Sequence, residues 1–150
     1  MRIALSIILP AKDEAEGLRR TLEGIVAAYP EAEVIVVDDG SRDATAQIAR
    51  DGGARVISNP YSMGNGAAIK RGATAANGDI LVFMDADGQH DAGHIAILLA
   101  KLDEGYDMVV GARDRSGQAN VQRGLANALY NRLASWMTGH PILDLTSGFR

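Results

Sequence analysis

Five apolar runs of strand length are separated along the chain by stretches with helical periodicity. The runs are rich in β-branched residues and nearly continuous in hydrophobicity, and they span residues 3–9, 33–39, 54–58, 79–85 and 107–112. A strand that is apolar throughout is covered on both faces, which is typical of a parallel sheet between helices. The pattern therefore predicts five strands of a mostly parallel sheet.

Apolar residues in the intervening stretches recur every three or four positions, as in helices that bury one face. Leu18, Leu22 and Ile25 show this spacing in the first stretch. Asp91 precedes a second such stretch, over 92–104, at the position of a helix N-cap. Strands alternating with helices predict a doubly wound α/β domain.

The chain contains no linker, repeat or low-complexity segment, so we expect a single domain over residues 1–150. Its last residues, "LDLTSGFR", resemble the opening of a further element, and we therefore expect truncation at the C-terminal end. The apolar start is short, and Pro10 and charged residues follow it instead of a small-residue cleavage site. This pattern indicates a buried strand and not a signal peptide.

Composition narrows the classes of partner. Acidic residues number 19 and basic residues 15, which gives a formal net charge of -4, and no basic stripe is present. Nucleic-acid binding needs a basic surface that neutralises phosphates, so nucleic acid is excluded as a partner. The absence of cysteine excludes disulfides and cysteine-based zinc sites. No apolar run approaches the ~20 residues that span a bilayer, and we expect a cytoplasmic chain.

Polar clusters follow four of the five predicted strands. They read "PAKDE", "DDGSRDAT", "DADGQHD" and "GARDR" after the first, second, fourth and fifth strands. Ligands of open parallel sheets bind outside the carboxyl ends of strands, near the point where strand order reverses. Solvation alone does not account for four polar clusters at one edge, so the sequence predicts a ligand site there.

Asp85 and Asp87 are the sharpest candidates for a metal site. Residues i and i+2 of an extended backbone share a face, and Gln89 follows closely. Such hard oxygen ligands suit Mg²⁺ or Mn²⁺, whose open positions phosphate oxygens can fill. Two neighbouring carboxylates repel each other unless a cation or a proton offsets them. Asp91 is interpreted as a helix cap instead.

Three other segments offer ligand contacts. The doubled Asp38-Asp39 exceeds the needs of a turn, and a carboxylate there can accept hydrogen bonds from a ribose hydroxyl or a base N–H. The glycine-rich segment 62–72 matches neither the dinucleotide-binding fingerprint nor a P-loop, and it is interpreted as the start of a helix whose amides face a ligand. Arg113, after the fifth strand, can clamp phosphate oxygens.

Taken together, the motifs resemble those of a family 2 glycosyltransferase of the GT-A fold, in its dolichol-phosphate mannosyltransferase-like branch. The resemblance covers essentially the whole chain, through "ILPAKDE", "VIVVDDGSRDAT", "GNGAAIKRG", "FMDADGQHD", "VVGARD" and "DLTSGFR" in that order. It implies a Rossmann-like nucleotide-binding domain and an inverting, metal-dependent transferase of cell-envelope or glycan biosynthesis. The donor is then a GDP- or UDP-sugar, and the first candidate acceptor is a polyprenyl or dolichyl phosphate.

The resemblance also implies roles for individual residues on the donor side. The nucleoside is held by Pro10, Ala11, Asp13 and Glu14, with Asp38 or Asp39. Asp85, next to Ala86, meets the ribose and the metal, while Asp87 and Gln89 complete the metal site as the DxD motif. Arg113 falls at the family's GxR arginine, which contacts phosphate. Asp87 and Arg113 thus stabilise the charge that develops on the departing diphosphate.

Residues near the C-terminal end are assigned to the acceptor side, namely Arg123, Asp144, Ser147 and Arg150. Asp144 falls where the family has an acidic residue near the acceptor. A polyprenyl phosphate is already anionic and needs little help from a base, whereas a sugar hydroxyl requires a carboxylate to take its proton. The role of Asp144 therefore depends on the acceptor.

The chain departs from the family pattern at a few positions and leaves rival interpretations open. Lys12 and Asp13 replace an aromatic residue and Asn, and Arg123 is the one clear basic residue where relatives carry several. The stretch 121–137 suits core packing, or else an interfacial helix that gives peripheral membrane contact. Rival functions are transfer to a saccharide hydroxyl, a truncated domain that binds donor without transfer, and a sugar-nucleotide pyrophosphorylase.

Overall fold

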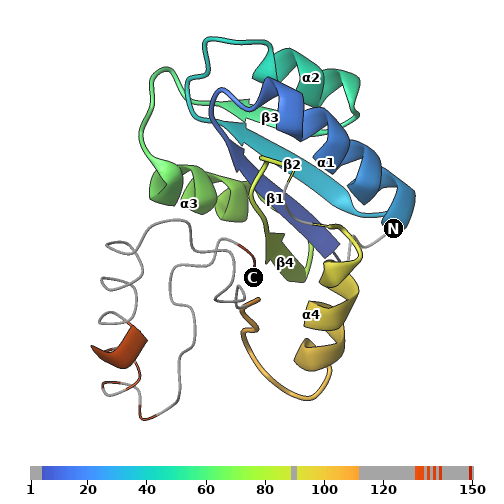
Figure 1. Ribbon diagram of the computed structural model, residues 1–150, viewed down its shortest axis with the longest axis vertical. Helices are drawn as coiled ribbons and strands as arrows, with labels where there is room; N and C mark the ends of the chain where they lie inside the picture. The colour runs from blue at the N-terminus through green and yellow to red at the C-terminus, as the bar shows by residue number, and fades with distance from the viewer. Residues whose placement is uncertain are drawn as a thin grey trace.

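Between residues 5 and 102, the described part of the computed structural model contains four strands alternating with four helices (Figure 1). The structure describes residues 5–88, 91–111, 131–133, 135, 137, 139 and 149. The elements, in chain order, are β1 (Leu5–Ala11), α1 (Ala15–Ala28), β2 (Glu33–Asp38), α2 (Thr45–Asp51), β3 (Arg55–Ser58), α3 (Asn65–Ala75), β4 (Ile80–Phe83) and α4 (His94–Leu102).

The four strands form one parallel sheet in the order β3-β2-β1-β4. The chain moves outward from β1 to β2 and β3, then returns through α3 to place β4 on the other side of β1. The strand order therefore reverses between β1 and β4, where open sheets of this kind bind ligands. The predicted doubly wound, parallel α/β architecture is confirmed.

Helices cover both faces of this sheet, and a separate core lies under each. On one face, α1, α2 and α4 pack against β1, β2 and β4, with Leu18, Ala49 and Ile95 fully buried. On the other face, α3 packs against Ile8 and Val37. These two layers explain why β1 and β2 read as continuous apolar runs, because residues on both of their faces are buried.

The predicted fifth strand is wrong within the described stretch 107–111, which forms no strand. Met108 is 69% exposed, and the Gly111 N–H donates to the carbonyl oxygen of Phe149. Hydrophobicity indicated a strand here, but a strand forms only where another strand offers it a ladder of backbone partners. Phe149 itself is buried and belongs to the same core cluster as Ile95 and Leu98 of α4.

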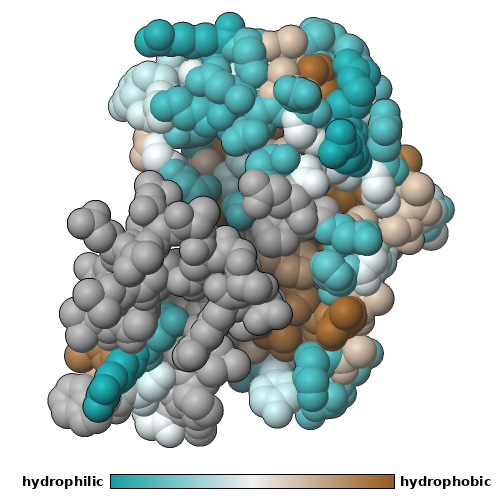
Figure 2. Space-filling view, in the orientation of Figure 1, coloured by the Kyte–Doolittle hydropathy of each residue, from teal (hydrophilic) through white to brown (hydrophobic). Residues whose placement is uncertain are grey.

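The helix predicted over 92–104 begins two residues later and ends two residues earlier, at Leu102. Gly93 and not Asp91 occupies the N-cap, and the Asp91 side chain accepts a hydrogen bond from the Gly93 N–H at 2.8 Å. An Asx turn has therefore taken the place of the predicted cap. Figure 2 shows an apolar area over α4, where Ile97 is 62% exposed.

The segment 121–137 lies mostly outside the described residues. Residues 131–133, 135 and 137 within it are helical, and the Ser135 hydroxyl donates to the Asn131 carbonyl oxygen. Core packing or membrane contact of this segment stays a prediction. Within the part of the chain that the structure describes, every helix is too short or too polar to span a bilayer.

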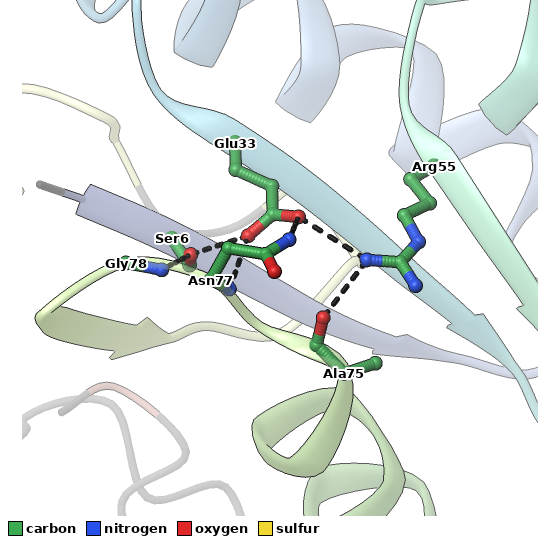
Figure 3. A network of polar contacts seen from close by, with 6 residues as sticks. All are labelled: Ser6, Glu33, Arg55, Ala75, Asn77 and Gly78. Carbon is green, nitrogen blue, oxygen red and sulfur yellow. Dashed lines mark hydrogen bonds and ion pairs between the residues drawn. The ribbon is translucent and has the colours of Figure 1, made fainter. Parts of the chain in front are cut away.

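Glu33 organises the amino-terminal edge of the sheet (Figure 3). Its carboxylate accepts hydrogen bonds from the Ser6 hydroxyl at 2.6 Å, from the backbone and side-chain nitrogens of Asn77 at 2.8 and 2.7 Å, and from Arg55 at 3.3 Å. Ser6 in turn accepts from the Gly78 N–H at 2.9 Å. The network joins β1, β2 and β3 to the turn before β4, and so fixes where β4 starts.

The same donors control the ionisation of Glu33. Burial alone would raise its pKa, since the side chain is only 10% exposed, but the hydrogen bonds from Ser6, Asn77 and Arg55 outweigh burial. The pKa is therefore held below its ordinary value of 4.5. A carboxylate with a lowered pKa stabilises the fold above the pKa of the unfolded chain, and this stabilisation is lost as pH falls through the folded pKa.

We expect Glu33→Gln to lower the free energy of unfolding by about 1–3 kcal/mol at pH 7, because its amide nitrogen would face donors that then lack an acceptor. The difference from wild type should shrink as the pH falls below 4.5, where Glu33 of the unfolded chain takes up a proton, and should vanish below the lowered pKa of the folded protein. Urea unfolding at several pH values measures both effects. Glu31→Gln, on an exposed side chain two residues earlier, is the control. Equal stability of the two variants at pH 7 would contradict the role of Glu33.

Candidate functional site

A cleft with a volume of about 300 Å³ opens at the carboxyl ends of β1 and β4. Four segments form its walls: the end of β1 with the turn after it, the residue after β2, the segment that leads into α3, and the residues after β4. The residues that line it are Pro10, Ala11, Lys12, Glu14, Asp39, Ser62, Gly64, Asn65, Ala68, Asp85, Ala86 and Asp87. The cleft thus lies at the reversal of strand order.

The structure brings together most of the described residues that the sequence assigned to the donor and the metal. Those that line the cleft are Pro10, Ala11, Glu14, Asp39, Asp85, Ala86 and Asp87. Asp13, in the loop after β1, and Asp38, the last residue of β2, do not line it. Gln89, Arg113, Arg123, Asp144, Ser147 and Arg150 lie outside the described residues. The placement supports a site on the donor side, while the assigned acceptor residues stay a prediction.

Asp13 links the loop after β1 to the loop after β2. Its N–H donates to the Ser41 hydroxyl at 3.0 Å, and its carboxylate accepts from the Arg42 N–H at 2.7 Å. These bonds hold Asp13 at φ 53°, in the left-handed region that non-glycine residues seldom adopt. Asp38 is buried and accepts from the Ser41 N–H at 3.0 Å. Both carboxylates therefore shape the loops beside the cleft.

Asp43 and Thr45 fix the start of α1 in the same manner. The Glu14 N–H donates to the Thr45 hydroxyl at 2.9 Å, and the Ala15 N–H donates to the Asp43 carboxylate at 3.1 Å. Thr45 also donates its hydroxyl and its N–H to Asp43. Asp43, just before α2, and Thr45, its first residue, thereby satisfy amides at the start of α1, which otherwise lack partners. As a result, Glu14 is fixed at the cleft.

Three carboxylates, of Glu14, Asp85 and Asp87, share the wall of the cleft nearest α1. The pKa of Glu14 is raised above its ordinary value, first by burial and then by repulsion from Asp87, Asp43, Asp85 and Asp13. A raised carboxyl pKa means that the folded protein disfavours further negative charge at this place. A bound divalent cation would relieve that repulsion, and hard carboxylate oxygens are suitable ligands for it.

The described residues alone do not form a complete metal site. Among them, no group of three or more His, Cys, Asp or Glu side chains is arranged to hold a metal ion. The predicted set contains only two such residues, Asp85 and Asp87, and its third member, Gln89, is not described. The donor chemistry fits Mg²⁺ or Mn²⁺, and the site itself stays a prediction.

Gly17 allows α1 to approach the backbone that carries Asp87. A Cβ atom at position 17 would lie 2.5 Å from the Asp87 carbonyl carbon and 2.6 Å from its oxygen. Gly88 adopts φ +77°, and a Cβ there would also lie 3.3 Å from the Gly17 oxygen. The two glycines thus bring the helix and the Asp85–Asp87 segment into direct backbone contact.

Asp39 contacts the segment between β3 and α3, residues 59–64, which we term the β3–α3 loop. Its carboxylate accepts hydrogen bonds from the Asn59 side chain at 2.6 Å, the Ser62 hydroxyl at 2.8 Å, the Met63 N–H at 2.8 Å and the Gly64 N–H at 2.9 Å. Asp39 is thereby joined to the rim of the cleft through protein groups.

The sequence did not predict the place of Lys12 at the rim of the cleft, and it predicted only in general terms that the start of α3 lies there. Among the described lining residues, Lys12 alone is basic, and its amino group donates to the Ser62 hydroxyl at 3.1 Å. The sequence marked Lys12 only as a departure from the family. Gly64, Asn65 and Ala68 also line the cleft, which agrees with the interpretation that the start of this helix faces a ligand.

Comparison with known proteins tests the resemblance. The sequence model of Glycosyl transferase family 2 matches residues 6–150. The chain belongs to this family. The expected family and GT-A type of fold are therefore confirmed.

Relatives within family 2 cover the same region. The chain is 41% identical to an uncharacterized glycosyltransferase of Mycobacterium tuberculosis over 73% of its length, and 32% identical over 93% to the undecaprenyl-phosphate 4-deoxy-4-formamido-L-arabinose transferase of Proteus mirabilis. These matches cover 49% and 46% of the two relatives, so the chain spans about half their length.

The chain is similar in structure to glucosyl-3-phosphoglycerate synthase from Mycobacterium tuberculosis, solved in complex with Mn²⁺, uridine-diphosphate-glucose and phosphoglyceric acid. It superimposes with a TM-score of 0.78 at 30% identity, over 98% of this chain and 55% of the synthase. Mannosyl-3-phosphoglycerate synthase from Rubrobacter xylanophilus, at 24% identity and a TM-score of 0.76 over 98% of this chain and 52% of that synthase, shares the fold.

We expect Gly17→Ala to lower the free energy of unfolding by roughly 1–3 kcal/mol, because the added methyl group collides with the Asp87 backbone and not with a flexible side chain. The amide NMR shifts of Asp87 and Gly88 should move as the segment is displaced. Gly24→Ala is a matched control on the same helix, since its methyl group would lie 3.8 Å from Ala92 Cβ. That variant should gain up to about 1 kcal/mol from helix propensity. Similar behaviour of both variants would contradict the close approach.

Proposed function

We propose that this chain forms the donor-binding part of an inverting glycosyltransferase that moves a sugar from a GDP- or UDP-sugar to an acceptor. The observation that carries the proposal is the acidic cleft at the reversal of strand order, where Asp85, Ala86 and Asp87 form one wall. Family 2 membership supports the same reaction class. The cleft also has the location that open α/β sheets use for nucleotides.

A divalent cation fits this proposal. Asp85 and Asp87 would hold it, with Gln89 as the proposed third ligand, and the repulsion felt by Glu14 favours a positive charge nearby. The synthase of Mycobacterium tuberculosis was solved with Mn²⁺ and uridine-diphosphate-glucose, which supports the same pairing of ion and donor here. When bound, the ion neutralises charge on a departing diphosphate.

The chain's own groups have complementary tasks on the donor. Lys12 is held at the rim through Ser62, and its ammonium group would attract the diphosphate into an otherwise acidic cleft. The start of α3 at Asn65 faces the same space, and helix starts favour anionic groups. Arg113, outside the described residues, is proposed as the second cation on the leaving group.

For the acceptor, we propose a polyprenyl phosphate as the first candidate. The Proteus mirabilis relative is named for undecaprenyl phosphate, which supports this class. A second candidate is a small phosphorylated acid, because the synthase structure contains phosphoglyceric acid. The first acceptor attacks through an anionic phosphate oxygen, whereas the second attacks through a hydroxyl whose proton must be accepted. Asp144 is the proposed base only in the second case.

We expect the wild-type chain to bind one sugar nucleotide in a manner that depends on Mn²⁺, and Asp87→Ala to weaken that binding by at least 10- to 100-fold, roughly the loss seen when metal sites are damaged. Calorimetric titration of UDP-glucose and GDP-mannose, with and without Mn²⁺, makes the measurement.

Asp103→Ala removes an exposed carboxylate at the end of α4 and serves as the charge-matched control, which should bind as wild type does. Equal binding with and without Mn²⁺, or unchanged binding by Asp87→Ala, would refute the role of the cation. Absence of binding by the wild-type chain to either nucleotide would refute the donor site.

A further inference from the structure

Asp39, Asn59 and Arg71 form a polar cluster that links β2, the β3–α3 loop and α3, and we term these three residues the Asp39 cluster. Asn59 donates its side-chain N–H to Asp39 and accepts a hydrogen bond from the Arg71 guanidinium. Asp39 and Asn59 are each only 4% exposed. A buried amide between a carboxylate and a guanidinium has its donor and acceptor sides fixed by the partners.

The Asp39 carboxylate has no acceptor capacity to spare. One oxygen accepts from the Asn59 side chain and the Met63 N–H, and the other accepts from the Ser62 hydroxyl and the Gly64 N–H. An ionised carboxylate offers about four acceptor positions in total. A ribose hydroxyl or base N–H that bonded to Asp39 would have to displace one of these protein donors.

The four bonds also keep Asp39 ionised inside the protein. Burial would raise its pKa, but the hydrogen bonds from Met63, Asn59, Ser62 and Gly64 outweigh burial and lower the pKa well below the ordinary range. A buried carboxylate with this many donors is expensive to disturb, because a donor that loses its partner remains unsatisfied. The β3–α3 loop is therefore tied firmly to the end of β2.

The consequences of this attachment reach the cleft. Ser62 and Gly64, which Asp39 holds, both line the cleft, and Gly64 is the N-cap of α3. Ser62 also accepts the hydrogen bond that places the Lys12 amino group. Gly40, directly after Asp39, lets the chain pass close to the same loop, because a Cβ there would lie 2.8 Å from the backbone of Tyr61 and Ser62.

We propose that Asp39 and Asn59 are positioning residues for the donor: they set the place of Ser62, Gly64 and the start of α3. This inference rests on the proposed donor site, which it deepens. The nucleoside contact that the resemblance implied for Asp38 or Asp39 stays a prediction. The geometry that supports the positioning role is the complete use of the Asp39 oxygens by the loop.

Asn59→Ala tests the proposal, because it removes one bond to Asp39 and leaves the lining residues unchanged. The probes are UDP and GDP with Mn²⁺, titrated by calorimetry, and the amide hydrogen exchange of Met63 and Gly64 without ligand. Glu33→Gln is the matched control, since it disturbs a buried carboxylate network of similar size at the opposite edge of the sheet. Urea unfolding of both variants shows whether their losses of stability are comparable.

We expect Asn59→Ala to bind the preferred nucleotide roughly 10-fold or more weakly, because the variant lacks the buried side-chain donor that helps Asp39 to hold the loop. Exchange of the Met63 and Gly64 amides should accelerate in this variant and stay slow in Glu33→Gln, whose nucleotide affinity should match that of wild type. A structural role alone would instead weaken binding equally in both variants. That result would overturn the proposal, as would unchanged affinity of Asn59→Ala.

The two proposals fail in different ways. If wild type binds neither UDP nor GDP, the donor site is wrong, and amide exchange alone then decides whether the Asp39 cluster holds the loop. Accelerated exchange limited to Asn59→Ala would support that attachment, and fast exchange of Met63 and Gly64 in wild type would refute it. If wild type binds nucleotide and Asn59→Ala binds equally well, only the positioning role is refuted.

Discussion

The backbone pairing of β1 on both of its sides is the constraint on which the rest of the structure depends. β1 pairs with β2 from Ser6 to Ala11 and with β4 from Leu5 to Ile8, in parallel register on each side. β4 lies on the side of β1 opposite to β2. The loops that follow β1 and β4 therefore diverge, and a cleft opens between them. The donor candidates among the described residues follow from that arrangement, since each stands within a few positions of a strand end.

Much of this arrangement could be predicted from the sequence, and the reason lies in how strands are buried. β1 and β2 are covered on both faces, so they read as continuous apolar runs, and the carboxylates that follow them were recognised as out of place. The run at 107–111 is apolar at its centre but forms no strand in the structure, because hydrophobicity does not reveal where a pairing partner lies. The composition of a segment shows whether it can be buried, whereas its pairing into a sheet depends on residues far away in the sequence.

The hydrogen-bond partners of the site carboxylates could not be predicted from the sequence in the same way. Asp38 and Asp39 are adjacent and chemically identical, yet one caps its own turn and the other holds a loop more than twenty residues away. Local spacing predicts the first kind of bond, since an Asx turn needs only nearby amides. The second depends on the fold bringing β3 beside β2, and for the same reason Lys12 was not recognised at the rim.

The carboxylates of this domain fall into two physical groups, and the contrast locates the site more sharply than composition does. Glu33 at one edge and Asp39 at the other are surrounded by donors that outweigh burial, so their pKa values are lowered and their charge stabilises the fold. Glu14 is affected in the opposite direction, because burial and the charges of Asp87 and Asp85 raise its pKa. Carboxylates kept together against their mutual repulsion cost stability, and a domain retains them where a cation or a ligand offsets that cost.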